Sequence, residues 1–113
     1  MKKGDVWWVE LADAHGHEQR GERPAVILGK ANGMTAVISM TANAGRAVLS
    51  HTLIIEPVKE NGLTKDSVAL IFHLRSLDKT RFKRRLGEVT AEEMAATDEM
   101  TADFLNMAAK QFT

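Results

Sequence analysis

The sequence predicts a small, mainly β domain (α+β class) that ends in one α-helix. The chain has 113 residues, which leaves room for one hydrophobic core, so we expect a single domain over residues 1–113. Up to residue 74, short apolar and β-branched runs are separated by Gly, Pro and Asn, as is typical of strands and turns. Residues 90–113 instead combine helical periodicity with a helix N-cap.

Two strands and a long loop are expected at the start of the chain. Residues 6–11 form a β-branched and aromatic run that predicts the first strand. Residues 12–22 are a polar loop of eleven residues, and loops of this length in small domains are often functional. Pro24 is expected to open a second strand over residues 25–28, because proline cannot donate to the ladder. The Asn-Gly pair at 32–33 then predicts a hairpin.

The hairpin leads into three further strands and a helix. Residues 35–40 and 52–56 are predicted strands, and residues 67–74, which are more continuously apolar, predict a central one. The capping-box pattern Thr90-x-x-Glu93 predicts a helix that begins at the next residue. We expect its apolar half to pack against the sheet, with the methionines of this region as core filler.

The composition excludes several classes of protein. Hydrophobic residues make up 44% and charged residues 27%, which indicates a folded globular chain. The absence of cysteine excludes disulfide scaffolds, thiolate nucleophiles and cysteine zinc sites. No His pair has the i, i+4 spacing of a helical zinc site, so we expect no metal and no cofactor. No apolar stretch resembles a membrane span or signal segment, which favours a cytoplasmic protein.

The net charge of zero conceals a polarised chain. Residues 1–85 contain fourteen basic and nine acidic residues, a net +5, whereas residues 86–113 contain one basic and six acidic residues, a net −5. The basic charge is densest at residues 79–85, where five of seven side chains are positive. This run is either a solvated loop or part of a face that binds a polyanion.

Two motifs carry a resemblance to a known family. Residues 4–9 read G-D-V-W-W-V, and residues 16–28 read G-H-E-Q-R-G-E-R-P-A-V-I-L. Together with shorter matches at 37–43, 66–68 and 75–79, they span roughly residues 2–82. The chain resembles the MazF/PemK family of toxin endoribonucleases in these segments.

The resemblance implies both a fold and an activity. The fold would be a small SH3-like β-barrel of the MazF/PemK/CcdB type with a C-terminal helix, working as a homodimer. The activity would be sequence-specific cleavage of single-stranded RNA, in particular mRNA, without a metal. Attack by the 2′-hydroxyl would leave a cyclic phosphate and a 5′-hydroxyl. A cognate antitoxin would silence the toxin, and we expect this antitoxin to be acidic and partly disordered.

The resemblance also assigns roles to individual residues. The catalytic pair would be Arg23 and Thr41. A candidate acid or base is His17. The positions that would contact RNA are Glu18, Gln19, Arg20, Asn43 and Arg75.

The chemistry suits this assignment. The planar guanidinium of Arg23 can give two parallel hydrogen bonds to phosphate oxygens, but its high pKa makes it a poor proton acceptor. The hydroxyl of Thr41 can donate one more bond to the transition state. Outside this motif, an Arg before Pro is often a salt-bridged surface residue and a Thr after a strand often caps a turn.

One departure from the family pattern leaves alternatives open. Phe72 and His73 stand where many members carry an acidic and then a polar residue, so the proton acceptor is unassigned. Phe72 could stack on a base or belong to the core. The alternatives to a ribonuclease are therefore a CcdB-like toxin that inhibits gyrase and an inactive homologue that binds RNA or antitoxin.

Overall fold

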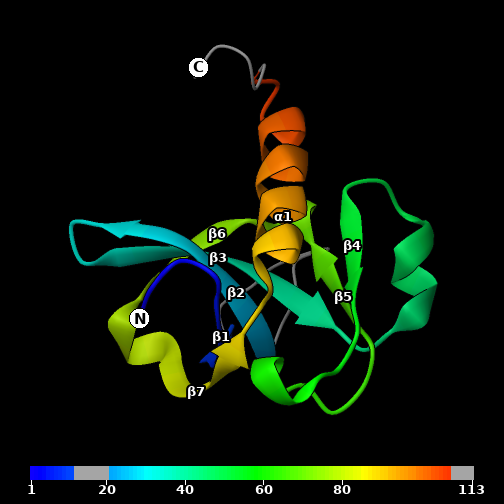
Figure 1. Ribbon diagram of the computed structural model, residues 1–113. Helices are drawn as coiled ribbons and strands as arrows, with labels where there is room; N and C mark the ends of the chain where they lie inside the picture. The colour runs from blue at the N-terminus through cyan, green and yellow to red at the C-terminus, as the bar shows by residue number, and fades with distance from the viewer. Residues whose placement is uncertain (12–20, 108–113) are drawn as a thin grey trace.

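The computed structural model describes residues 1–11 and 21–107, and the statements below concern these residues. They form one antiparallel sheet and one helix (Figure 1). The elements are β1 (Asp5–Glu10), β2 (Glu22–Ala31), β3 (Met34–Thr41), β4 (Thr52–Ile55), β5 (Ser67–Leu70), β6 (Arg75–Asp78), β7 (Phe82–Glu88) and α1 (Ala91–Phe104). The strand order is β4-β5-β3-β2-β1-β7, and β6 pairs with β3 outside this path. The mainly β class is confirmed, although the edge strands β4 and β7 do not pair to close a barrel.

The β2–β3 hairpin forms at the predicted turn. Ala31 pairs with Met34, and the two residues between them, Asn32 and Gly33, have φ of 55° and 80°. Asn and Gly tolerate this left-handed region, which a two-residue turn needs to match the twist of its strands. The second strand nevertheless begins at Glu22, two residues before Pro24. Because the β2–β3 ladder ends at Ala25, the proline removes no hydrogen bond on that side.

The strand predicted over residues 67–74 ends early. β5 stops at Leu70, and the 3₁₀ helix η3 (Ile71–His73) follows, with the Leu74 N–H bonded to the Ile71 carbonyl. The apolar run continues because Ile71 is fully buried in the core, not because the strand continues. Periodicity alone does not distinguish these two cases in short apolar runs.

Two strands were absent from the prediction. β6 pairs with β3, and β7 pairs with β1. The basic run is therefore not simply a solvated loop, since η4 (Lys79–Arg81) leads directly into β7. β7 is an edge strand, and charged side chains are common there because they discourage pairing with other chains.

The sheet separates two hydrophobic clusters. The larger includes Val26, Ile38 and Met40, together with residues of β4, β5 and η3. The smaller includes Ala25 and Val37 on the alternate positions of the same strands. Both faces of β2 and β3 are therefore apolar near their centres, and polar side chains are left at the strand ends.

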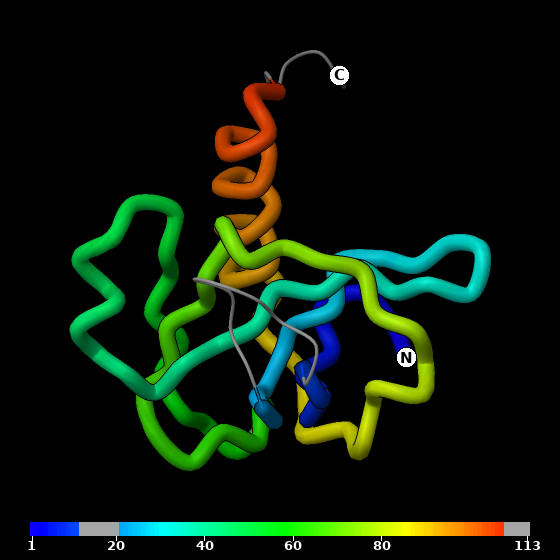
Figure 2. The backbone as a smooth tube through the Cα atoms, turned by 180° about the vertical axis from the view of Figure 1, so that it is seen from behind, coloured from blue at the N-terminus to red at the C-terminus, as the bar shows by residue number. Residues whose placement is uncertain are grey.

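Helix α1 begins at the predicted residue. Thr90 Oγ1 accepts from the Glu93 N–H at 3.0 Å, and Glu93 Oε1 accepts from the Thr90 N–H at 2.9 Å, which confirms the capping box. The helix packs on the larger cluster through Met94 and Met100. The helix rises between the β2–β3 hairpin on one side and the η1–β4 segment on the other, where η1 is Ala44–Val48 (Figure 2).

The end of the helix does not pack as predicted. Phe104, Leu105 and Met107 are 40%, 48% and 41% exposed, and this end projects beyond the strands (Figure 1). Met107 is therefore not core filler. The helical periodicity was correct, but the sheet is too small to cover the last turn.

A close contact fixes the segment between β4 and β5 against β7. A Cβ at Gly87 would lie 2.2 Å from the Glu60 carbonyl oxygen of η2 (Lys59–Asn61), so only glycine fits there. Asn61 is fully buried and bonds to the backbone of Glu56, Val58 and Leu63. These contacts hold residues 62–67 beside the end of the sheet.

Candidate functional site

The strand alternation places Arg23 and Thr41 on the same face of the sheet. The β2–β3 ladder ends with Ala25 opposite Ser39, and Arg23 and Thr41 each lie two residues beyond this last pair. Arg75 of β6 pairs with Val37 and so lies on the same face of the sheet, further along β3. Three residues from distant parts of the sequence therefore share one surface.

The Arg23 side chain is half-buried and available to an anion. Its Nε is buried without a hydrogen-bond partner, and no carboxylate of the described residues forms an ion pair with it. This part of the structure thus contains no surface salt bridge that would explain Arg23. Because buried polar groups are nearly always paired in folded proteins, an unpaired guanidinium N–H at a surface pocket indicates a site that receives a ligand.

Thr41 has a structural bond and a free donor. The Asn43 N–H donates to Thr41 Oγ1 at 3.2 Å, and Asn43 Oδ1 accepts from the Gly45 N–H at 3.1 Å to cap η1. Thr41 therefore caps a turn, as the simpler interpretation of the sequence expects. Since its oxygen accepts this bond, the hydroxyl hydrogen remains able to donate to a ligand.

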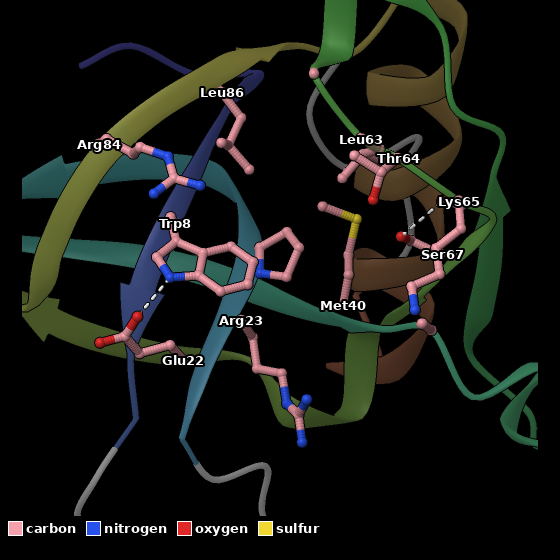
Figure 3. Close-up of a pocket in the computed structure, with 13 residues that line it drawn as sticks. Trp8, Glu22, Arg23, Met40, Leu63, Thr64, Lys65, Ser67, Arg84 and Leu86 are labelled. Carbon is pink, nitrogen blue, oxygen red and sulfur yellow. Dashed lines mark hydrogen bonds between the residues drawn. The ribbon is translucent and has the colours of Figure 1, made fainter.

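A pocket of about 360 Å³ lies beside Arg23 (Figure 3). Its apolar walls come from three strands and the segment between η2 and β5, and they are Pro24, Met40, Leu63 and Leu86. At its edge, the indole Nε1–H of Trp8 donates to Glu22 Oε1 at 2.6 Å. The guanidinium carbon of Arg84 lies 5.6 Å from the centre of the indole ring, a cation–π contact.

No sequence pattern singles out Trp8, Glu22 or Arg84 as residues of one site. In the sheet, Trp8 pairs with Pro24 on one side and with Arg84 on the other, and Glu22 is the next residue of β2 on the Pro24 face. The side-chain alternation of the first strand places Trp8 on one face, but it does not tell which residues of other strands lie beside it. With Lys65 also on the pocket rim, the pocket is bordered by more positive than negative side chains.

Several predicted residues cannot be placed. His17, Glu18, Gln19 and Arg20 lie outside the described residues. Within residues 1–11 and 21–107, no group of three or more His, Asp or Glu side chains is arranged to hold a metal ion.

Phe72 and His73 lie away from the Arg23 pocket. Phe72 lines a second hollow with Leu49, His51 and Phe104, beside the end of α1. The ring of His73 is buried and lies 4.7 Å from that of Phe72. His51 is not an ordinary strand-edge residue, because it has a φ of 58° and its Nε2 lies 2.7 Å from Asp103 Oδ2 of the helix. Phe72 and His73 thus lie on the helix side of the molecule.

The chain matches a family described as PemK-like, MazF-like toxin of type II toxin-antitoxin system over residues 2–105. This match includes every strand, helix α1, and the positions of Arg23, Thr41 and Arg75. The chain belongs to this family. No helix of the described residues is long and apolar enough to cross a membrane.

Individual relatives agree with the family assignment. The chain is 31% identical over 109 residues to endoribonuclease MazF9 of Mycobacterium tuberculosis, covering 88% of this chain and 91% of the relative. The crystal structure of MazF (Form-I) from Deinococcus radiodurans matches with a TM-score of 0.80 and 27% identity, covering 95% and 97% of the two chains. The MazE-MazF (Form-II) structure from the same organism shares the fold, with a TM-score of 0.72 and 23% identity over 96% and 97%.

Proposed function

We propose that this PemK/MazF-family toxin is a metal-independent endoribonuclease that cleaves single-stranded RNA, in particular mRNA, at specific sequences. The observation that carries the proposal is the placement of Arg23 and Thr41 on one face at the ends of β2 and β3, beside a pocket with a mainly positive rim. The name of the relative MazF9, an endoribonuclease at 31% identity, supports the same activity.

The proposed reaction is attack of a ribose 2′-hydroxyl on the adjacent phosphorus. A P–O bond to the 2′-oxygen forms and the P–O5′ bond breaks, which yields a 2′,3′-cyclic phosphate and a 5′-hydroxyl. The 2′-hydroxyl proton goes to a general base, and the 5′-oxygen takes up a proton as it leaves. His17 is the candidate for one of these proton transfers.

Arg23 and Thr41 would act on the phosphate itself. As the phosphorus becomes five-coordinate, negative charge accumulates on its two non-bridging oxygens. The Arg23 guanidinium would donate to these oxygens, and the Thr41 hydroxyl would add one donor. Because both groups are set by the strands before substrate binds, little reorganisation is needed in the transition state.

The test is cleavage of a long defined RNA in EDTA, with mapping of 5′-hydroxyl ends. We expect Arg23→Ala and Thr41→Ala each to lower the cleavage rate by about 10²-fold or more, because each removes a preorganised donor. Lys30→Ala is the matched control, since Lys30 is an exposed cation on the hairpin. Cleavage by either site variant within a few-fold of wild type would refute the assignment. Intact RNA together with stalled gyrase would support the CcdB-like alternative, and RNA binding without cutting would support an inactive homologue.

The proposed partners are a cognate antitoxin and a second copy of the chain. One chain of the MazE-MazF structure from Deinococcus radiodurans shares the fold of this chain. An acidic antitoxin segment would complement the Lys65 and Arg84 side chains of the pocket rim. We place the action of the toxin in the cytoplasm, where its proposed substrate mRNA is found.

The exposed apolar side chains at the end of α1 provide a surface for the second copy. Leu49, Phe104 and Leu105 are 42%, 40% and 48% exposed, and the hollow beside Phe72 adjoins them. We call these residues the helix-end patch. Apolar surface of this kind is typically covered in an oligomer. A homodimer through the helix-end patch would leave the Arg23 pocket, which Phe72 does not line, open to RNA.

A further inference from the structure

We propose that the pocket beside Arg23 binds one unpaired base of the RNA, and that Glu22 selects bases that carry an exocyclic amine. The inference rests on the proposed ribonuclease function and adds the feature of the substrate that the enzyme reads. It gives a role to the cluster of Trp8, Glu22 and Arg84, which takes no part in the proposed cleavage chemistry.

The pocket lies next to the group that would bind the scissile phosphate. Glu22 and Pro24 flank Arg23 on β2, at a rise of about 3.3 Å per residue. Alternate strand residues point to opposite faces, and Figure 3 shows Arg23 extending away from the indole of Trp8, which lies beside Glu22. Arg23 nevertheless lines the pocket at the end of β2, so a phosphate on its guanidinium would lie next to a base held there.

The pocket has the shape and lining that a base requires. Its volume, about 360 Å³, is near the lower end of the range for small-molecule sites, which suits one planar group. Pro24, Met40, Leu63 and Leu86 supply the apolar walls. Aromatic rings and guanidinium planes are the usual stacking partners of unpaired bases, and Trp8 with Arg84 supplies both.

Glu22 provides the selection. The 2.6 Å bond from Trp8 Nε1 to Oε1 holds the exposed carboxylate at the pocket edge and leaves Oε2 able to accept from a ligand. An ionised carboxylate only accepts hydrogen bonds, so it pairs with the exocyclic amine of cytosine, adenine or guanine. Uracil has the acceptor O4 at the position of the cytosine amine. Two acceptors would then lie opposite each other, which is repulsive.

The charges favour a nucleotide over a neutral peptide side chain. Arg84 and Lys65 are exposed on the rim, where they can contact the phosphates on either side of the bound base. Glu22 alone is negative among the lining side chains, and its carboxylate is directed by the indole N–H. The site therefore combines phosphate attraction around its edge with one fixed acceptor at its mouth.

The experiment compares matched RNAs cut by matched variants. Short RNAs that contain a mapped cleavage site are prepared with cytidine or uridine, and with adenosine or inosine, at the positions on either side of the cut. At one of these positions, we expect wild type to cut the amine-bearing RNA at least about tenfold faster, the effect of one good base contact. Glu22→Gln should bring the ratio close to one, because an amide both donates and accepts. Trp8→Phe keeps an aromatic ring, loses the N–H and should lower the ratio partly.

Controls separate this inference from the proposed function. Glu99→Gln makes the same chemical change at an exposed position of α1 and should keep the wild-type ratio. If wild type cuts no RNA, the ribonuclease proposal itself fails. Circular dichroism first shows that Glu22→Gln and Trp8→Phe are folded. If wild type cuts RNA and both variants keep the wild-type ratio of cleavage rates, only the base pocket is refuted. Loss of binding to an acidic antitoxin peptide with an unchanged base ratio would likewise overturn it, in favour of a peptide site.

Discussion

Asn61 offers a quantitative test of how the pocket wall is held. Its Oδ1 accepts from the N–H groups of Val58, at 3.1 Å, and of Leu63, at 3.0 Å, and its Nδ2 donates to the Glu56 carbonyl at 2.8 Å. The side chain is fully buried. Asn61→Ala removes all three bonds without adding volume, so it tests the bonds rather than overpacking.

The expected loss of stability follows from where the three partners lie. The Leu63 N–H is buried, and leaving it unpaired costs about 1–3 kcal/mol. The other two bonds are partly buried, so water can replace part of each, and each contributes about 0.5–1 kcal/mol. We therefore expect Asn61→Ala to lower the free energy of unfolding by about 2–5 kcal/mol. Because Leu63 lines the pocket, RNA cleavage by the folded variant should fall as well.

The measurement is urea unfolding followed by circular dichroism. Asn43→Ala is the control, since Asn43 is exposed and its side chain makes one bond, to the Gly45 N–H, for which we expect a loss of about 1 kcal/mol or less. A loss for Asn61→Ala below about 1 kcal/mol, or equal to that of the control, would refute the view that these bonds fix the segment.

Two further predictions concern Asp5 and the helix-end patch. Burial would raise the pKa of Asp5, but the Lys2 N–H and the Arg85 guanidinium outweigh it and lower the pKa below 3.8. The ionised carboxylate therefore stabilises the fold above its unfolded pKa, and this contribution is lost as the pH falls through the lower folded value. Asp5→Asn should be less stable than wild type in urea at about pH 7, with a smaller difference at about pH 3; an equal difference at both would contradict this. For the patch, Leu105→Glu should convert a dimer to a monomer in sedimentation, whereas Met34→Glu, on an equally exposed methionine of the hairpin, should not; a monomeric wild type would disprove the dimer.

The parts of the fold that were predicted correctly depend on neighbours in sequence. The Asn-Gly turn and the Thr90–Glu93 capping box are formed by residues at most three apart, so their signals are complete in the sequence. η3 and β7 were missed because their character depends on distant partners. The apolar side chain of Ile71 reflects its burial in the core and not a strand. The basic residues of β7 form a strand because they pair with β1.

The candidate site divides in the same way. The sequence motif by itself determined the family and the proposed roles of Arg23 and Thr41, because these depend on residue type and spacing. Only the tertiary structure decided that the two side chains share a face and that Trp8, Glu22 and Arg84 frame a pocket beside them. The physical reason is that strand register and close packing, such as the contact of Gly87 with η2, join segments far apart in the chain. No local pattern records which residues such contacts bring together.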